Sequence, residues 1–128
     1  MSTIKKILIV EDDDYISKIY EIKFAKEGIA ISIARDGEEA VKKASTENPD
    51  LILLDLMIPK KDGFEVLEEI KSTSKNAKTP VIVLSNLGQA SDIERAEKLG
   101  AQDFLVKVDH SIQDVVEKVN KSLKITMV

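Results

Sequence analysis

The stretch Leu51-Ile52-Leu53-Leu54-Asp55-Leu56 is an apolar run with one carboxylate near its end. Asn48-Pro49-Asp50 precedes this run, and Pro59 and Gly63 follow it. Apolar residues at both odd and even positions are typical of a strand buried on both faces, as in a parallel sheet covered by helices. Burying a charge at the end of such a strand costs free energy unless another group or a ligand interacts with it. Open parallel sheets bind ligands at the carboxyl ends of their strands. Asp55 is therefore the first candidate for chemistry.

The composition restricts the function classes. The chain has 128 residues, of which 43% are hydrophobic and 33% charged, and its net charge is −4. We expect one domain that does not bind nucleic acid, because such binding needs a basic face. The absence of cysteine excludes disulfides and zinc–thiolate sites, and a single histidine excludes a histidine-rich metal centre. Neither a membrane span nor a signal peptide is recognisable, so we expect a cytoplasmic protein that does not enter membranes.

Four further short apolar runs predict strands, and residues at helical spacing between them predict helices. We expect Asp13 or Asp14 to cap the first helix, Ser91 and Glu94 to form a capping box on the fourth, and Ser111 to cap the last. The expected strands are 7–10, 29–33, 51–56, 81–85 and 103–106.

This alternation predicts a doubly wound α/β fold of the flavodoxin-like type, with five helices covering a five-stranded parallel sheet. Polar residues close four of the strands, and strand 29–33 lacks one, so it belongs at an edge. The order 2-1-3-4-5 satisfies this condition. The four polar strand ends carry Asp12, Asp55, Ser85 and Lys107.

Side by side, these strand ends form one pocket. Glu11, Asp12 and Asp55 would repel one another unless a cation joins them, and oxygen ligands of this kind favour Mg²⁺. Ser85 offers a hydroxyl and Lys107 an ammonium group, both suited to an anion with several oxygens. The joint interpretation is that Asp55 accepts a phosphoryl group, with Mg²⁺ and Lys107 neutralising its charge.

From Lys6 to about Leu123, the chain resembles the receiver domains of two-component response regulators, in particular the stand-alone chemotaxis type. The motifs that carry this resemblance are the acidic cluster, the segment around Asp55, Gly63, Ser85 and Lys107. The resemblance implies that Glu11 and Asp12 are the acidic metal pair, Asp55 is the phosphoacceptor, Met57 lends its backbone carbonyl to the metal, and Phe104 swings inward when Ser85 moves.

The family mechanism implies a signalling switch rather than an enzyme. A histidine kinase or a histidine phosphotransfer protein would supply the phosphoryl group, and a downstream protein would recognise the changed surface of the fourth helix, fifth strand and fifth helix. The sequence identifies neither partner.

Three departures from the family pattern carry predictions. Val108 replaces the usual proline after Lys107, so we predict a trans bond with a rearranged loop, or else a strained cis bond, because a non-proline cis bond costs about 2.5–4 kcal/mol. Asn86 replaces a small residue and could bond a phosphoryl oxygen or narrow the entrance. Met57 and Leu87 flank the site where polar residues could position water, so we predict slow self-dephosphorylation.

Four alternative functions compete with this interpretation. An aspartate-nucleophile phosphatase of the haloacid dehalogenase type needs a second aspartate where Met57 stands, and a flavin carrier needs a phosphate-binding loop where this chain has acids. A pseudo-receiver that never takes phosphate and a receiver excised from a larger regulator both stay open.

Several residues outside the pocket carry weaker expectations. The two tyrosines of the first helix are expected to pack along it, and kinase recognition is expected near Ile16, Ile19 and Tyr20. His110 is expected in a loop or at a helix start, without a catalytic role. The tail 124–128 could pack back, contact a partner or mark a cut.

Overall fold

The computed structural model describes residues 4–123, so the expectations for the tail 124–128 lie outside the described residues. Strands and helices alternate along the chain, as predicted. The elements are β1 (Lys6–Val10), α1 (Asp14–Lys26), β2 (Ala30–Ala34), α2 (Gly37–Glu47), β3 (Leu51–Leu54), α3 (Gly63–Ser72), β4 (Val81–Ser85), α4 (Ala90–Lys98), β5 (Asp103–Val106), a short 3₁₀ turn η1 (Lys107–Asp109) and α5 (Ile112–Ser122).

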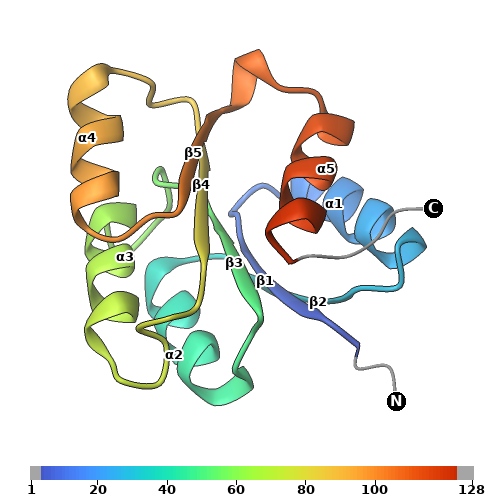
Figure 1. Ribbon diagram of the computed structural model, residues 1–128, viewed down its shortest axis with the longest axis horizontal. Coiled ribbons are helices and arrows are strands. Elements are labelled where there is room, and N and C mark those ends of the chain that lie inside the picture. Colours follow the sequence, from blue (N-terminus) through green and yellow to red (C-terminus); the bar gives the residue numbers. More distant parts are fainter. Residues whose placement is uncertain (1–3, 124–128) are drawn as a thin grey trace.

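The five strands form one parallel sheet in the order β2-β1-β3-β4-β5, which confirms the predicted flavodoxin-like topology and the edge position of β2. Helices α1 and α5 cover one face of the sheet, and α2, α3 and α4 cover the other (Figure 1). Such a three-layer arrangement buries the central strands on both sides, as the continuous apolar run of β3 indicated.

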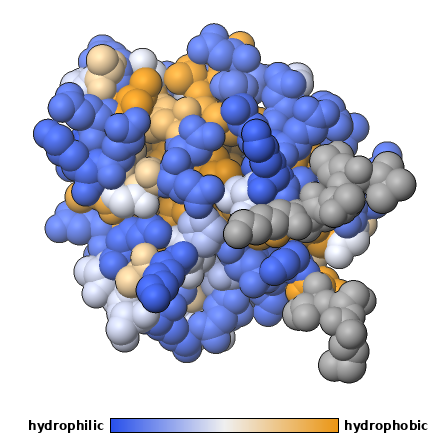
Figure 2. Space-filling view, in the orientation of Figure 1, coloured by the Kyte–Doolittle hydropathy of each residue, from blue (hydrophilic) through white to orange (hydrophobic). Residues whose placement is uncertain are grey.

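Alternate side chains of each strand feed two separate cores. Ile7, Leu53 and Ile82 pack on the face covered by α1 and α5. Leu8 and Leu54 pack on the face covered by α2, α3 and α4. Polar side chains cover most of the outer surface in Figure 2, and an apolar patch lies over β5 between α4 and α5.

The helix starts are built mostly as the sequence predicted. Asp13 caps α1 by accepting hydrogen bonds from Tyr15 and Ile16 backbone N–H groups, and Ser111 caps α5 in a reciprocal capping box with Asp114. These bonds satisfy N–H groups that have no partner within the helix.

The predicted capping box of Ser91 and Glu94 on α4 is wrong. The helix begins at Ala90, two residues before the start that a Ser91 cap would give, so Ser91 lies inside its first turn. Gln89 takes the capping position, where its side chain makes no capping bond and its carbonyl accepts from the N–H groups of Asp92 and Ile93. Three strands also differ from their expected bounds, since β1 begins at Lys6, β2 is shifted by one residue and β3 ends at Leu54.

The segment after β5 takes the trans alternative predicted for Lys107–Val108. The described residues 4–123 contain no cis peptide bond. The chain continues from β5 into the turn η1, where the carbonyl of Lys107 accepts from the N–H of His110. His110 lies in the connection before α5, as expected. Within 4–123, no helix has both the length and the apolar character needed to cross a bilayer.

Candidate functional site

The pairing of β1 with β3 places two acidic residues side by side. Val10 and Leu54 are partners in the register, so Glu11 and Asp55, which follow them, leave the sheet at the same edge. The N–H of Asp55 still donates to the carbonyl of Val10 at 3.1 Å. The backbone ladder, not a flexible loop, therefore fixes the position of Asp55.

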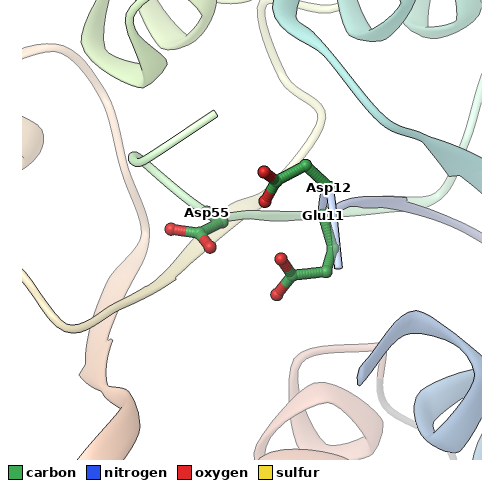
Figure 3. Close-up of side chains that lie close together, drawn as sticks. All are labelled: Glu11, Asp12 and Asp55. Atoms are coloured by element: carbon green, nitrogen blue, oxygen red, sulfur yellow. The ribbon is translucent and has the colours of Figure 1, made fainter. Parts of the chain in front are cut away.

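Three carboxylates meet at this edge. Glu11, Asp12 and Asp55 each offer an oxygen, and these oxygens lie within 4.8 Å of one another (Figure 3). Glu11 is 4% and Asp55 6% exposed, whereas Asp12 is open to solvent. The sequence prediction that β1 and β3 bring these acids together is confirmed in its geometry.

Lys107 bridges the two buried acids. Its Nζ donates to Oε1 of Glu11 and to Oδ2 of Asp55, each at 2.8 Å. Only 20% of the Lys107 side chain is exposed. Charge-assisted hydrogen bonds in such a shielded place are stronger than surface ion pairs. The contact between Lys107 and Asp55 follows the prediction, and the contact with Glu11 was missed.

Burial and pairing act in opposite directions on these groups. Burial raises the pKa of Glu11 above its ordinary 4.5, and the hydrogen bond from Lys107 only partly offsets this. Burial lowers the pKa of Lys107, but its hydrogen bonds to Asp55 and Glu11 outweigh burial and leave that pKa above 10.5. Lys107 therefore stays charged, and one ammonium faces three carboxylates.

Two backbone N–H groups complete the cluster. Met57 N–H donates to Oδ1 of Asp55 at 3.0 Å, and Asp13 N–H donates to Oε2 of Glu11 at 3.2 Å. Asp13, predicted only as a helix cap, thus also holds the Glu11 carboxylate through its backbone. Asp13 therefore joins the start of α1 to the acidic site.

Ser85 closes β4 and is fully buried. Its Oγ accepts from the N–H of Leu87 at 3.3 Å, and no hydrogen bond joins it to the acids or to Lys107 among residues 4–123. Leu87 and Phe104 are half-buried and pack against the core shared by α2, α3 and α4. Ser85 is therefore linked to that core through its neighbour rather than to the carboxylates.

The loop after Asp55 is held close to the start of α3. Gly63 N–H donates to the carbonyl of Leu56 at 3.1 Å, and a Cβ at Gly63 would lie 2.3 Å from the Leu56 Cα, so only glycine fits. Lys60, in the same loop, has a left-handed φ of 69°. The side chain of Met57 is 59% exposed at the rim.

The remaining predicted residues differ in how far they are exposed to solvent. Val108 is 80% exposed and Asn86 is also exposed. Ile16 and Ile19 are half-buried on α1, whereas Tyr20 is only 6% exposed, so burial removes it from the surface expected to contact a kinase.

The sequence profile of the response regulator receiver domain matches residues 7–120. The chain belongs to this family. Among solved structures, the receiver domain of the Francisella response regulator 1452 is similar, with a TM-score of 0.84, 35% identity and coverage of 94% of this chain and 97% of that one. The phosphorylated cyanobacterial phytochrome response regulator RcpA has a TM-score of 0.85, 33% identity and 98% coverage of both chains.

Curated relatives of this receiver domain are transcriptional regulators. The probable transcriptional regulator ycf27 of Guillardia theta is 37% identical over 128 residues, which cover 95% of this chain and 49% of the relative. PhoP of Bacillus subtilis, the alkaline phosphatase synthesis transcriptional regulatory protein, is 39% identical over 103 residues, covering 80% and 42%. The chain thus spans about half the length of the curated relatives it matches.

Family membership decides against two of the alternatives. The match to the receiver family over residues 7–120 is inconsistent with a haloacid dehalogenase phosphatase and with a flavin carrier. Receiver domains are signalling switches rather than typical enzymes. The pseudo-receiver and the excised receiver are both consistent with these comparisons.

Proposed function

We propose that the chain is a single receiver domain, 1–128, that switches a signalling partner by accepting a phosphoryl group on Asp55. The observation that carries this proposal is the contact of Lys107 Nζ with Oδ2 of Asp55 at 2.8 Å, beside two more acids. A buried carboxylate beside a fixed ammonium and a cation-binding acidic pair is suited to receive a phosphoryl group, since this transfer depends on positioning and charge neutralisation.

In the transfer, a carboxylate oxygen of Asp55 attacks phosphorus on a phosphohistidine of the donor protein. The new O–P bond forms as the P–N bond breaks, and the imidazole leaves with its electron pair. Lys107 already contacts the acceptor and needs little movement to neutralise the incoming oxygens. Met57 N–H holds the other carboxylate oxygen and orients the acceptor.

The residues present fit a magnesium ion, because all the side-chain donors are carboxylate oxygens within 4.8 Å of one another. Glu11, Asp12 and Asp55 would hold it, together with the backbone carbonyl of Met57. Mg²⁺, when bound, supplies positive charge for the phosphoryl oxygens. The exposure of Asp12 gives the ion a route from solvent.

Ser85 and Phe104 form the switch in this proposal. The Ser85 Oγ accepts from Leu87, so its own proton remains available to donate to a phosphoryl oxygen. A shift of Ser85 would displace Leu87, which packs in the same core as Phe104 and Ala96 of α4. The surface around α4, β5 and α5 would then change for a downstream protein.

The donor in this proposal is a histidine kinase or a histidine phosphotransfer protein of the cytoplasm. The receiver itself contacts neither nucleic acid nor membrane, in keeping with its net charge of −4. Met57 and Leu87 offer no polar group to orient water, so the phosphorylated form is expected to persist. A lifetime of seconds or less at room temperature would contradict slow self-dephosphorylation.

The deciding experiment incubates the chain with acetyl phosphate and Mg²⁺ and measures its intact mass. We expect a gain of one phosphoryl group, lost in Asp55→Asn and kept in the matched control Asp50→Asn, which changes an exposed carboxylate at the opposite end of β3. No gain in the unaltered chain, with a phosphohistidine donor also failing, would favour the pseudo-receiver.

A further inference from the structure

The start of α2 holds the middle of the loop that follows Asp55. The N–H of Gly37, the first residue of α2, donates to the carbonyl of Pro59 at 3.1 Å. The N–H of Lys61 donates to the same carbonyl at 2.8 Å, so the loop curls around this oxygen. Pro59 itself is exposed. A helix start on one strand connection therefore fixes a loop on another that otherwise faces solvent.

Gly37 is buried at this contact and has no room for a side chain. A Cβ at Gly37 would lie 2.4 Å from the Lys61 Cβ, 2.9 Å from the Val66 Cγ2 and 3.0 Å from the Lys61 carbonyl oxygen. Both helices are fixed by fully buried side chains, which are Ala40 and Ala44 of α2 and Val66 of α3. Lys61 is only half-buried. Since close-packed interiors resist displacement, the loop rather than either helix would move.

The same loop presents the backbone carbonyl of Met57, which belongs to the proposed cation site. The beginning of the loop is fixed by the bond from Met57 N–H to Asp55 at 3.0 Å, and its end by the bond from Gly63 N–H to Leu56 at 3.1 Å. Between these two points, Gly37 holds the loop from a separate element. The path of the backbone at Met57 therefore depends on where α2 begins.

Side chains add little to this contact. The ammonium of Lys60 lies 3.6 Å from Asp36 and 4.0 Å from Glu38, both at the start of α2. The Lys60 side chain is 59% exposed, and ion pairs in such places contribute at most about 1 kcal/mol. The backbone bond and the close packing at Gly37 are thus the main connection between α2 and the loop.

We propose that Gly37 is a positioning residue for the divalent-cation site, because it lets the start of α2 hold the loop that presents the Met57 carbonyl. This inference rests on the proposed function of the acidic cluster. Groups that orient metal ligands strengthen metal binding. A loop that is already held in place also loses less conformational freedom when the ion binds.

The test compares two glycine variants of the full chain. Gly37→Ala should push the loop away, and Mg²⁺ dissociation constants from isothermal titration calorimetry should rise about fivefold, the factor for one hydrogen bond of ordinary strength. Gly28→Ala is the control, at the end of α1 far from the acids. Gly28 has a φ of 75° and nothing within 4 Å of an added Cβ, so this change strains the backbone alone. Its Mg²⁺ affinity should stay within about twofold of the parent, and urea midpoints show that both variants are folded.

A second substitution tests whether the effect passes through the loop. Lys61→Gly removes the Cβ that an alanine at position 37 would meet at 2.4 Å. The double variant Gly37→Ala/Lys61→Gly should therefore bind Mg²⁺ within about twofold of Lys61→Gly alone. A loss in the double variant as large as that in Gly37→Ala would overturn the inference.

Amide hydrogen exchange tests the same contact in the unaltered chain. If the bond from Gly37 to Pro59 favours Mg²⁺ binding, Mg²⁺ must favour that bond by the same factor, because coupling between two equilibria is reciprocal. Saturating Mg²⁺ should slow exchange of the Gly37 amide about fivefold in nuclear magnetic resonance spectra. The Gly28 amide, which donates to the Ala25 carbonyl at 3.0 Å, is the reference and should change less than about twofold.

Two outcomes would overturn the inference and leave the proposed function intact. One is an equal Mg²⁺ affinity in Gly37→Ala and Gly28→Ala. The other is an exchange rate of the Gly37 amide that does not respond to Mg²⁺ while the calorimeter records binding. A parent chain that binds no Mg²⁺ would overturn both the inference and the proposed cation site.

Discussion

The middle of the sheet and its carboxyl-terminal edge differ over the distance of a single residue. Leu51 to Leu54 of β3 are at most 2% exposed and entirely apolar. Asp55, the next residue, is almost as deeply buried at 6%, yet it carries a carboxylate. Burial of the apolar β3 side chains stabilises the fold, because apolar surface leaves water. Burial of the Asp55 carboxylate destabilises the fold, because the ion loses its hydration.

This difference separates the residues that hold the fold from those that perform its function. The middle needs only well-packed apolar side chains. At the edge, the cost of burying negative charge must be offset, and the ammonium of Lys107 does this by pairing with both Glu11 and Asp55. Changes in the middle should therefore alter stability and leave the site competent, whereas changes at the edge should alter both, in ways that depend on cations and pH.

The largest expected effect on stability comes from the interior. Leu67→Ala empties a fully buried position of α3 and should lower the free energy of unfolding by roughly 2–5 kcal/mol. Urea denaturation measures this loss, and calorimetry below the transition should find Mg²⁺ affinity unchanged. Val108→Ala, at an 80% exposed apolar position, is the control and should cost less than about 0.5 kcal/mol. A large loss of Mg²⁺ affinity in folded Leu67→Ala would contradict the distinction between residues that hold the fold and residues that bind the ion.

At the edge, Lys107→Ala leaves two buried carboxylates without their common counter-charge. We expect a loss of roughly 2–4 kcal/mol in the absence of divalent cations, somewhat below a fully buried pair because a fifth of the side chain is exposed. Mg²⁺ should recover most of this loss, because the ion then becomes the only cation in the cluster. Urea denaturation with and without Mg²⁺ measures both effects.

The control for this change is Lys98→Ala. Its ammonium pairs with Glu94 at 3.5 Å on an exposed face of α4, and such pairs contribute at most about 1 kcal/mol. Mg²⁺ should act on this variant as on the parent chain. If Mg²⁺ stabilised Lys107→Ala no more than the parent, the compensating role of Lys107 would be contradicted.

Glu11→Gln is expected to reveal the cost of burying a charge at the edge. Burial raises the folded-state pKa of Glu11 above 4.5, so the native state binds the proton more tightly than the unfolded state. The contribution of Glu11 to the stability of the parent chain therefore falls as pH rises through this range, and the neutral glutamine escapes that fall. The variant should be the more stable at pH 7, and the difference should shrink as pH drops toward and below 4.5.

Thermal unfolding across this pH range in the absence of Mg²⁺ checks the prediction. Glu68→Gln, on the exposed face of α3, serves as the matched control. A stability difference that grew toward acid pH would show the opposite sign and contradict the account.

The same contrast explains what the sequence could predict. Continuous apolar runs identified the strands, and the polar residues that end them identified the edge, so topology and the meeting of Glu11, Asp12, Asp55 and Lys107 followed from local pattern. The burial of Tyr20 against β1 and β3 did not follow, because it depends on how α1 rotates against these strands. The start of α4 was misplaced because Ser91 and Glu94 have capping chemistry, whereas the helix is capped at Gln89, whose side chain makes no capping bond.

The smallest expected effect concerns backbone strain at the edge. Lys60 adopts a left-handed φ of 69° in the loop after Asp55, a conformation that costs a side-chain-bearing residue about 1–2 kcal/mol. Lys60→Gly removes this cost, loses the weak ion pairs of Lys60 with Asp36 at 3.6 Å and with Glu38 at 4.0 Å, and adds freedom to the unfolded chain. The net result should be a gain of about 0.5 kcal/mol in urea denaturation. Lys78→Gly, at an exposed loop lysine outside the left-handed region, should instead lose stability. A loss in both variants would mean that the Lys60 side chain stabilises the functional edge more than its backbone strains it.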